Sequence, residues 1–268
     1  MKLKIIFENS QFLVVDKPSG LVVNKSETVK EETLQDQLSR YFGLSGGEFG
    51  IGGRSGIVHR LDRETSGLIV VAKVQKAFNS LQEQFRNRLV EKQYIALVHG
   101  SLKEADGDIK LRIGRIGKFG KFGVMNKRSK SGRETETSYK LIDRFRFKDK
   151  EFLRLTGSNL TKARINYLKN HGFFYSLLTV FPKTGRTHQI RVALKSIGYP
   201  VVSDLIYTPG KLLKFDLLWC KRLFLHASKL TFMDPVSKEM VGFISDLPKD
   251  LKDAMLNLEE IVNFKFRI

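Results

Sequence analysis

The chain of 268 residues carries 47 Lys and Arg against 28 Asp and Glu, a formal net charge of +19. A positive field of this size favours anionic partners, and nucleic acid is the commonest large anion in a cell. The single Cys220 excludes an internal disulfide, and no apolar run has the length of a membrane-spanning helix or of a secretory signal. We therefore expect a folded cytoplasmic protein that binds nucleic acid and has no membrane partner.

In the first part of the chain, apolar patterning predicts strands and two helices. Thr33 is a typical N-cap for a helix with Leu34, Leu38 and Tyr41 at helical spacing. A glycine-rich loop then precedes a continuous apolar run, which is typical of a strand buried on both faces. The remaining expected elements are strands at 4–7, 11–15 and 94–98, a turn at 16–20, the buried strand at 68–72 and a helix at 77–89.

Beyond residue 100 the chain becomes strongly basic. Residues 109–133 hold nine Lys or Arg, no acid and four glycines at intervals of three, which we interpret as a flexible basic loop. Phe119 and Phe122 within it could stack on bases or pack inside the protein. A Lys-rich insertion is expected at about 144–172. Other expected elements are strands at 136–147 and 174–181, helices at 161–170 and 188–197, strands near Leu223 and Leu230, and a closing helix and strand.

Strands outnumber helices, and few strand–helix–strand units recur. This pattern predicts an α+β fold with a mixed, mostly antiparallel sheet rather than a doubly wound one. The chain shows no repeat and no clear linker, so we expect one domain over residues 1–268.

The segment His59–Gly67 places Asp62 between Arg60 and Arg63, directly before the buried strand. Neighbouring positive charge favours the ionised form of a carboxylate, which can then act as a nucleophile or a base. Arginine also suits contacts with phosphate. The alternative interpretation is an ordinary surface ion pair, which contributes little.

A second polar segment, Thr184–Val192, has Gly185 ahead of a predicted helix start. Its Thr, His and Gln side chains are typical of an anion-binding helix N-terminus. Arg191 follows about one turn into the helix, where it could reach a carboxylate. A capped amphipathic helix would explain Thr187 and Ile190, but not the density of donors.

These segments, in order along residues 4–250, resemble the RluA-type pseudouridine synthases. The residues that carry the resemblance are Asp16–Gly20, His59–Gly67, Lys92–Ala96, Gly185–Arg191, Gly198–Pro200, Asp204–Tyr207 and Arg222–Ala227. The resemblance implies the pseudouridine synthase fold, a long curved mixed sheet with flanking helices and loops and a central active-site cleft. It also implies isomerisation of uridine to pseudouridine in structured RNA, either rRNA or tRNA, after the base is flipped out of the stack.

The resemblance also implies roles for individual residues. Asp62 matches the catalytic aspartate, and Arg60 matches the arginine that fills the gap left by the flipped uridine. Tyr94 matches the tyrosine that packs on the flipped base, whereas Arg191 matches the basic partner of the aspartate. Further RNA-binding candidates are His59, Arg63, Thr65, Arg186, Thr187, His188, Gln189 and Ile190.

The isomerisation needs no redox step and no external group, so we expect no cofactor. The histidines show no metal-ligand spacing, so we expect no metal. We expect a monomer that begins directly at the catalytic domain, without the small S4-type domain that many relatives carry in front. Two positions depart from the family pattern: Ala193 stands where many relatives have His, and Ser203 where many have Gly.

Three other functions compete with this interpretation. A metal-dependent nuclease or a paired-carboxylate glycosidase needs several converging acids, yet the segment His59–Gly67 offers only Asp62 and Glu64. The remaining alternative is a non-catalytic RNA-binding or RNA-chaperone protein that retains the fold. Whether Asp62 attacks ribose C1′ or removes a proton from C2′ stays open.

Overall fold

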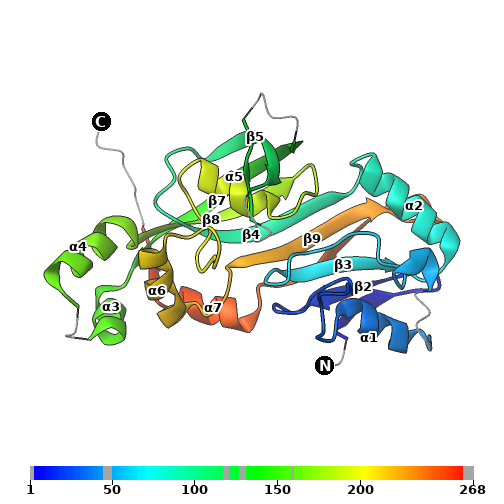
Figure 1. The fold of residues 1–268 in the computed structure, drawn as a ribbon, viewed down its shortest axis with the longest axis horizontal. Helices are drawn as coiled ribbons and strands as arrows, with labels where there is room; N and C mark the ends of the chain where they lie inside the picture. Colours follow the sequence, from blue (N-terminus) through cyan, green and yellow to red (C-terminus); the bar gives the residue numbers. More distant parts are fainter. Residues whose placement is uncertain (1–2, 45–49, 117–120, 127–130, 158–159, 262–268) are drawn as a thin grey trace. The chain divides into compact units, whose positions relative to one another are not determined.

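The computed structural model describes residues 3–44, 50–116, 121–126, 131–157 and 160–261. Its contacts divide into two compact units, each built from two stretches of chain (Figure 1). Unit 1 consists of Met1–Gln93 and His226–Asp246, and unit 2 of Tyr94–Leu225 and Leu247–Ile268.

Unit 1 is a small mixed sheet with two helices. Its strands follow the order β1-β2-β3-β9-β10, antiparallel except for the parallel pair β3–β9. All residues of β2 and β3 are buried, and for β3 the continuous apolar run at 68–72 predicts this burial. The elements are β1 (Ile5–Glu8), β2 (Phe12–Lys17), α1 (Leu34–Tyr41), the 3-10 turn η1 (Ile51–Gly53), β3 (Ser66–Ala72), α2 (Gln75–Arg86), β9 (Leu225–Met233) and β10 (Met240–Ile244).

Helix α1 begins where the sequence predicts. The Thr33 side chain accepts a hydrogen bond from the backbone N–H of Asp36, and the Asp36 carboxylate accepts from the N–H of Thr33. This reciprocal pair satisfies donors that the first helical turn leaves unpaired. The predicted strands and helices of the first part of the chain are thus confirmed, with shifted ends.

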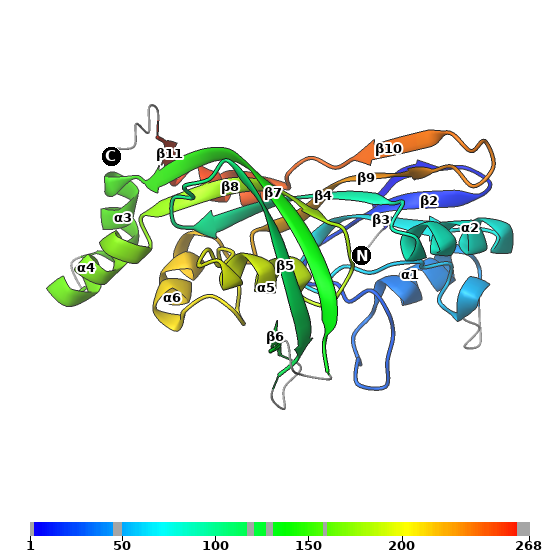
Figure 2. The same ribbon diagram turned by 90° about the horizontal axis from the view of Figure 1, so that it is seen from above.

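Unit 2 is an antiparallel sheet in the order β4-β8-β7-β5-β6, with β11 paired to β7. Strands β5 and β7 run side by side and curve together (Figure 2). The strands are β4 (Glu91–His99), β5 (Asp106–Arg115), β6 (Phe122–Val124), β7 (Arg133–Phe147), β8 (Phe174–Pro182) and β11 (Leu258–Glu260). The helices are α3 (Asp149–Thr156), α4 (Lys162–His171), α5 (Gln189–Ser196), α6 (Gly210–Trp219) and α7 (Lys249–Met255).

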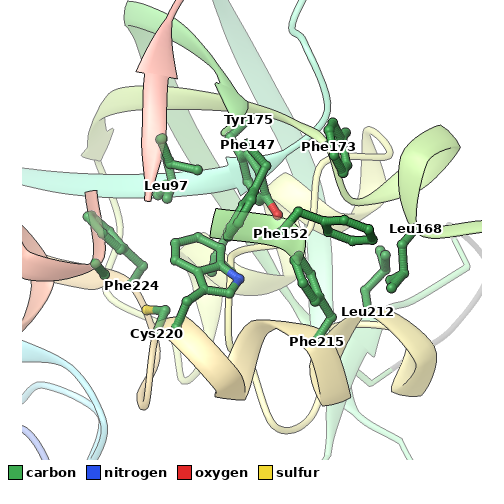
Figure 3. Packing of buried hydrophobic residues seen from close by; sticks show 14 of the residues in the cluster. Leu97, Phe147, Phe152, Leu168, Phe173, Tyr175, Leu212, Phe215, Cys220 and Phe224 are labelled. Atoms are coloured by element: carbon green, nitrogen blue, oxygen red, sulfur yellow. The ribbon is translucent and has the colours of Figure 1, made fainter. Parts of the chain in front are cut away.

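An aromatic core holds α3, α4 and α6 against β7 in unit 2 (Figure 3). The Phe147 ring lies 5.0 Å from Phe215 and 5.3 Å from Trp219, centroid to centroid, and Phe152 packs on both Phe173 and Phe215. Cys220 is buried in this core, as expected of a small apolar side chain.

The prediction of a flexible basic loop over 109–133 is wrong in part, because residues up to Arg115 belong to β5 and 122–124 form β6. Apolar and basic residues alternate from Ile109 to Ile113, as in a strand with one solvated face, and the glycines obscured that pattern. Phe122 is half-buried in β6, whereas Phe119 lies outside the described residues.

The basic insertion contains more structure than predicted. Helix α4 confirms the helix expected at 161–170, but α3 was not predicted, and residues 144–147 continue β7. Helix α6 was also missed. The expectation of two strands near Leu223 and Leu230 is wrong, because one strand, β9, begins at Leu225 and includes Leu230. The α+β class and the mostly antiparallel sheet pairing are confirmed.

Candidate active site

Asp62 lies in unit 1, in the loop that enters β3. Leu61 before it is buried and anchors the loop, while Asp62 is half-buried and Arg60 is exposed. The backbone N–H of Thr65 donates to the Asp62 carbonyl at 3.2 Å, closing a turn over Arg63 and Glu64. The Asp62 carboxylate therefore lies on a hydrogen-bonded turn, and Leu61 directly before it is fixed in the core.

The segment Asp16–Gly20 holds this turn in place by donating hydrogen bonds to backbone carbonyls of the turn. Lys17 is buried, and its Nζ donates to the carbonyls of Pro18 and Leu21 at 2.8 Å and of Arg63 at 3.0 Å. The N–H of Gly20 donates to the same Arg63 carbonyl at 2.8 Å. These bonds satisfy a buried ammonium group, whose desolvation would otherwise be costly.

The side chain of Ser19 adds a further bond, from its Oγ to the Glu64 carbonyl at 2.6 Å. The Arg63 guanidinium donates to the Gly20 carbonyl at 3.2 Å and pairs with Glu31 at 2.9 Å. The carbonyls of Arg63 and Glu64 thus accept the bonds that hold the loop, a role that sequence patterns could not reveal because every residue has a carbonyl. The Arg60 guanidinium makes no hydrogen bond or ion pair with the described residues.

A close backbone approach fixes the other end of the loop. Gly67 pairs with Ala227 across the parallel β3–β9 contact, and a Cβ on Gly67 would lie 2.2 Å from the Ala227 carbonyl oxygen. Its φ of +117° also lies in the region that favours glycine. Beside it, the ring of buried His226 is hydrogen-bonded to the Ser66 hydroxyl at Nδ1 and to the Ser245 carbonyl at Nε2. His226, from the motif Arg222–Ala227, therefore stabilises the fold.

His59 is held inside unit 1 as a neutral ring. Its Nε2 accepts from the Val70 N–H at 3.1 Å, and the ring stacks on Phe85 with centroids 4.5 Å apart. Desolvation, and then the positive charge of Lys92, lower the pKa of His59 to about 3. Desolvation likewise lowers the pKa of Lys92 to about 8. With Nε2 occupied by β3, the imidazole mainly supports the strand that carries the loop.

Arg191 lies in unit 2, buried in α5. Its Nε and Nη2 each donate to a different Asp204 carboxylate oxygen at 2.7 Å, a two-pronged pair with almost no exposure. Asp204 also accepts from the N–H groups of Ile206 and Tyr207. The guanidinium carbon lies 5.2 Å from the centre of the Tyr207 ring. Asp204 was placed in a family motif by sequence, but its pairing with Arg191 was missed.

The donors ahead of α5 differ in what they contact. His188 adopts a left-handed backbone with φ of +57°, and its Nδ1 shares a hydrogen bond with the Tyr207 hydroxyl at 2.9 Å. Buried Gln189 donates to the Glu136 carbonyl and to Thr137, and accepts from the Thr184 hydroxyl and the Arg186 N–H. A direct RNA contact by Gln189 would break these bonds.

Of the other candidates, Ile190 is buried, Thr65 is buried in unit 1, and Arg186 and Thr187 are exposed. Tyr94 is the first residue of unit 2 and lies in β4, paired with Val180 of β8 and 9% exposed. The structure thus brings Arg60, Asp62, Arg63 and Thr65 together in one loop of unit 1. It brings His188, Gln189, Ile190 and Arg191 together at the start of α5 in unit 2.

Across the described part of the chain, no group of three or more His, Cys, Asp or Glu side chains is arranged to hold a metal ion. None of the described helices has the length and apolar content needed to cross a membrane.

Known proteins similar to this chain point to one enzyme class. Residues 11–196 match the sequence profile of RNA pseudouridylate synthases. An uncharacterized RNA pseudouridine synthase of Synechocystis is 33% identical over 96% of this chain and 69% of its own length. The ribosomal large subunit pseudouridine synthase D of Zymomonas mobilis is 33% identical over 93% of this chain and 71% of its own length.

A solved structure agrees with these sequence matches. Human RNA pseudouridylate synthase domain containing 1 superposes with a TM-score of 0.70 at 25% identity, covering 99% of this chain and 91% of that one. The chain therefore belongs to the RNA pseudouridine synthase family and has its α+β fold. It is an enzyme of the RluA type, an isomerase that converts uridine into pseudouridine in RNA, as the sequence resemblance implied.

Proposed function

We propose that Asp62 is the catalytic carboxylate of this isomerase. The observation that carries the proposal is the construction of its loop: a half-buried carboxylate on a turn whose backbone is clamped by buried Lys17 and by Ser19. A catalytic group must be held in a defined direction before the substrate arrives. Asp62 belongs to a loop with that property.

In the reaction, the bond between ribose C1′ and uracil N1 breaks and the base turns. A bond between C1′ and C5 then forms, C5 loses its proton and N1 gains one. No group enters or leaves, so one carboxylate acting as nucleophile or base is sufficient. Arg60 would fill the space of the flipped uridine and Tyr94 would pack on its ring.

Arg191 is proposed as the cation that keeps the Asp62 carboxylate ionised, since nearby positive charge favours the charged form. Asp204 supports this role because it holds the guanidinium in one orientation with two 2.7 Å bonds. Arg186, Thr187 and His188, at the start of α5, are proposed to contact the RNA backbone, together with His59 and Arg63 near Asp62.

We propose structured RNA as the substrate, in a single catalytic domain that works as a monomer in the cytoplasm without a cofactor. The names of relatives that modify the large ribosomal subunit make ribosomal RNA the first substrate to test, with tRNA as the alternative. Mapping pseudouridine in total RNA from cells with and without the gene distinguishes the two.

The decisive variant is Asp62→Asn, which keeps the shape of the side chain but removes the ionisable group. We expect pseudouridine formation to fall about a thousandfold or more while RNA affinity stays near that of the wild type. Glu64→Gln is the matched control, because it makes the same change two residues away in a side chain with no proposed role. Substantial activity of Asp62→Asn would contradict the assignment of Asp62. Loss of RNA affinity together with activity would favour a binding role.

A further inference from the structure

Five basic residues gather on two neighbouring helices of unit 2, outside every segment that carries the family resemblance. Lys162, Arg164 and Lys169 belong to α4, and Lys211 and Lys214 to α6. All are exposed except Arg164, which is half-buried. We refer to these five residues as the α4–α6 basic face; Figure 1 shows the two helices that carry it.

The α4–α6 basic face is held firmly by the protein beneath it. Leu168 of α4 and Leu212 of α6 are buried in the aromatic core of unit 2 (Figure 3). The Arg164 Nη2 donates to the Lys211 carbonyl at 2.5 Å, which joins the two helices directly. The positive groups are thus presented by fixed helices rather than by a solvated loop, the alternative that the sequence left open for this insertion.

Among the described residues, no acidic side chain pairs with the α4–α6 basic face. No Asp or Glu occurs between Phe152 and Ser203, and the acid of α6, Asp216, is buried and bonded to His99 at 2.9 Å. Within the described ranges, none of the five basic residues forms a salt bridge. By contrast, Arg154 of α3 pairs with Glu151 at 2.6 Å, and Lys249 of α7 pairs with Asp253 at 2.5 Å.

Helix stability alone would not select this arrangement. Lys162 and Arg164 lie in the first turn of α4, where the helix dipole disfavours cations. Two cations also converge on one ring: the Lys211 Nζ lies 5.1 Å and the Arg164 Cζ 5.9 Å from the centre of Tyr167. Each contact is a cation–π interaction that fixes the position of the cation without neutralising its charge, so both positive charges remain available to a polyanion.

We propose that the α4–α6 basic face binds the phosphate backbone of the RNA substrate, as an auxiliary contact that adds affinity without taking part in the chemistry. The Tyr167 ring stacks on His171 with centroids 4.6 Å apart, so its part is to hold Arg164 and Lys211 in place rather than to bind a base. The proposal rests on the proposed function for the identity of the polyanion, and it extends that function to residues with no family role.

The test compares Arg164→Gln/Lys211→Gln with Lys249→Gln/Lys252→Gln, two variants that each remove two positive charges from exposed helices. In the control, Asp253 already balances Lys249. Binding to total RNA from cells that lack the gene is measured over a series of salt concentrations. We expect the slope of log Kd against log salt to fall by about 1 to 2 for the first variant, since each lost phosphate contact removes roughly 0.7 to 0.9. We expect no change for the control.

Equal slopes in wild type and the Arg164→Gln/Lys211→Gln variant would overturn the proposal. Unchanged RNA binding with lost binding to phosphatidylserine vesicles would also overturn it, in favour of a membrane surface. Pseudouridine formation by the wild type is scored separately on the same RNA. If the wild type forms no pseudouridine, the proposed function fails, while the salt slopes still decide whether this face binds RNA.

Discussion

The Asp62 loop of unit 1 and the start of helix α5 in unit 2, which carries Arg191, are stabilised in different ways. Around Asp62, buried Lys17 and the Ser19 hydroxyl bind backbone carbonyls and leave the functional side chain half-exposed. At the start of α5, the functional side chain itself is buried, and a carboxylate binds it directly. In the first region the contacts hold the backbone of the loop in place, whereas in the second they hold the Arg191 guanidinium in one orientation.

This difference determines which property each substitution should change. Damage to the clamp of unit 1 should reposition Asp62 and reduce the rate. Damage to the ion pair of unit 2 should leave a buried charge uncompensated and reduce stability first. The following experiments test that division.

Arg191→Met should have the largest effect on stability. Removing one partner of a buried ion pair typically costs about 3–5 kcal/mol, because the other charge stays buried. Urea unfolding measures the change. In a double-mutant cycle with Asp204→Leu, the double variant should be less destabilised than the sum of the single variants. Simple additivity would show that the two charges do not depend on each other.

Gly67→Ala should destabilise by about 2–5 kcal/mol, combining an overpacking cost with left-handed backbone strain. Its Cβ would meet the Ala227 carbonyl oxygen at 2.2 Å. Gly20→Ala is the control, since its φ is +87° but nothing lies within 4 Å of the added Cβ. It should cost about 1 kcal/mol. If both variants lose the same free energy of unfolding in urea, the contact with the Ala227 carbonyl does not account for the cost of Gly67→Ala.

Lys17→Met should cost about 2–4 kcal/mol, because buried carbonyls lose their donor. We expect a fall in kcat with little change in KM for RNA, since the change acts on the loop of Asp62. Lys4→Met removes the same charge from an exposed lysine that pairs with Asp16 at 2.6 Å, and it should cost under about 1 kcal/mol. A normal kcat in Lys17→Met would mean that the clamp does not position Asp62.

Ser203 should give the smallest and most discriminating effect. It has φ of +57°, is fully buried, and donates from Oγ to the Cys220 carbonyl at 2.5 Å. Ser203→Gly relieves backbone strain but loses that bond, so we expect a net change below about 1 kcal/mol. Ser203→Ala keeps the strain and loses the bond, which should cost about 1–3 kcal/mol by thermal or urea unfolding. Equal effects would show that strain is unimportant there.

The sequence predicted elements well where apolar spacing was regular and poorly where lysine and glycine were dense. The run at Leu68–Ala72 and the cap at Thr33 specify β3 and α1 through local physics. Strand β5 and helices α3 and α6 were missed because their apolar positions become apparent as buried faces only against β7 and the aromatic core. Tertiary packing decided these segments.

The sequence predicted which residues belong to the candidate site, but it did not predict most of the contacts that hold them. Motif order identified Asp62 and Arg191 as candidates, but it could not reveal that Asp204 binds Arg191 or that Lys17 binds the Arg63 carbonyl. Backbone carbonyls are present at every residue and leave no pattern in a sequence. The departure at Ser203, by contrast, was visible in advance, and the structure shows that its backbone conformation is the one glycine prefers.

Lys17 has a consequence for the electric field of its loop. Each peptide carries a dipole of about 3.5 D, and the N–H of a trans peptide points opposite to its carbonyl. Because the Arg63 carbonyl points inward to the buried ammonium, the N–H of that peptide, on Glu64, points outward. One lysine in the interior thereby polarises the peptide between Arg63 and Glu64, with its positive end directed away from the core.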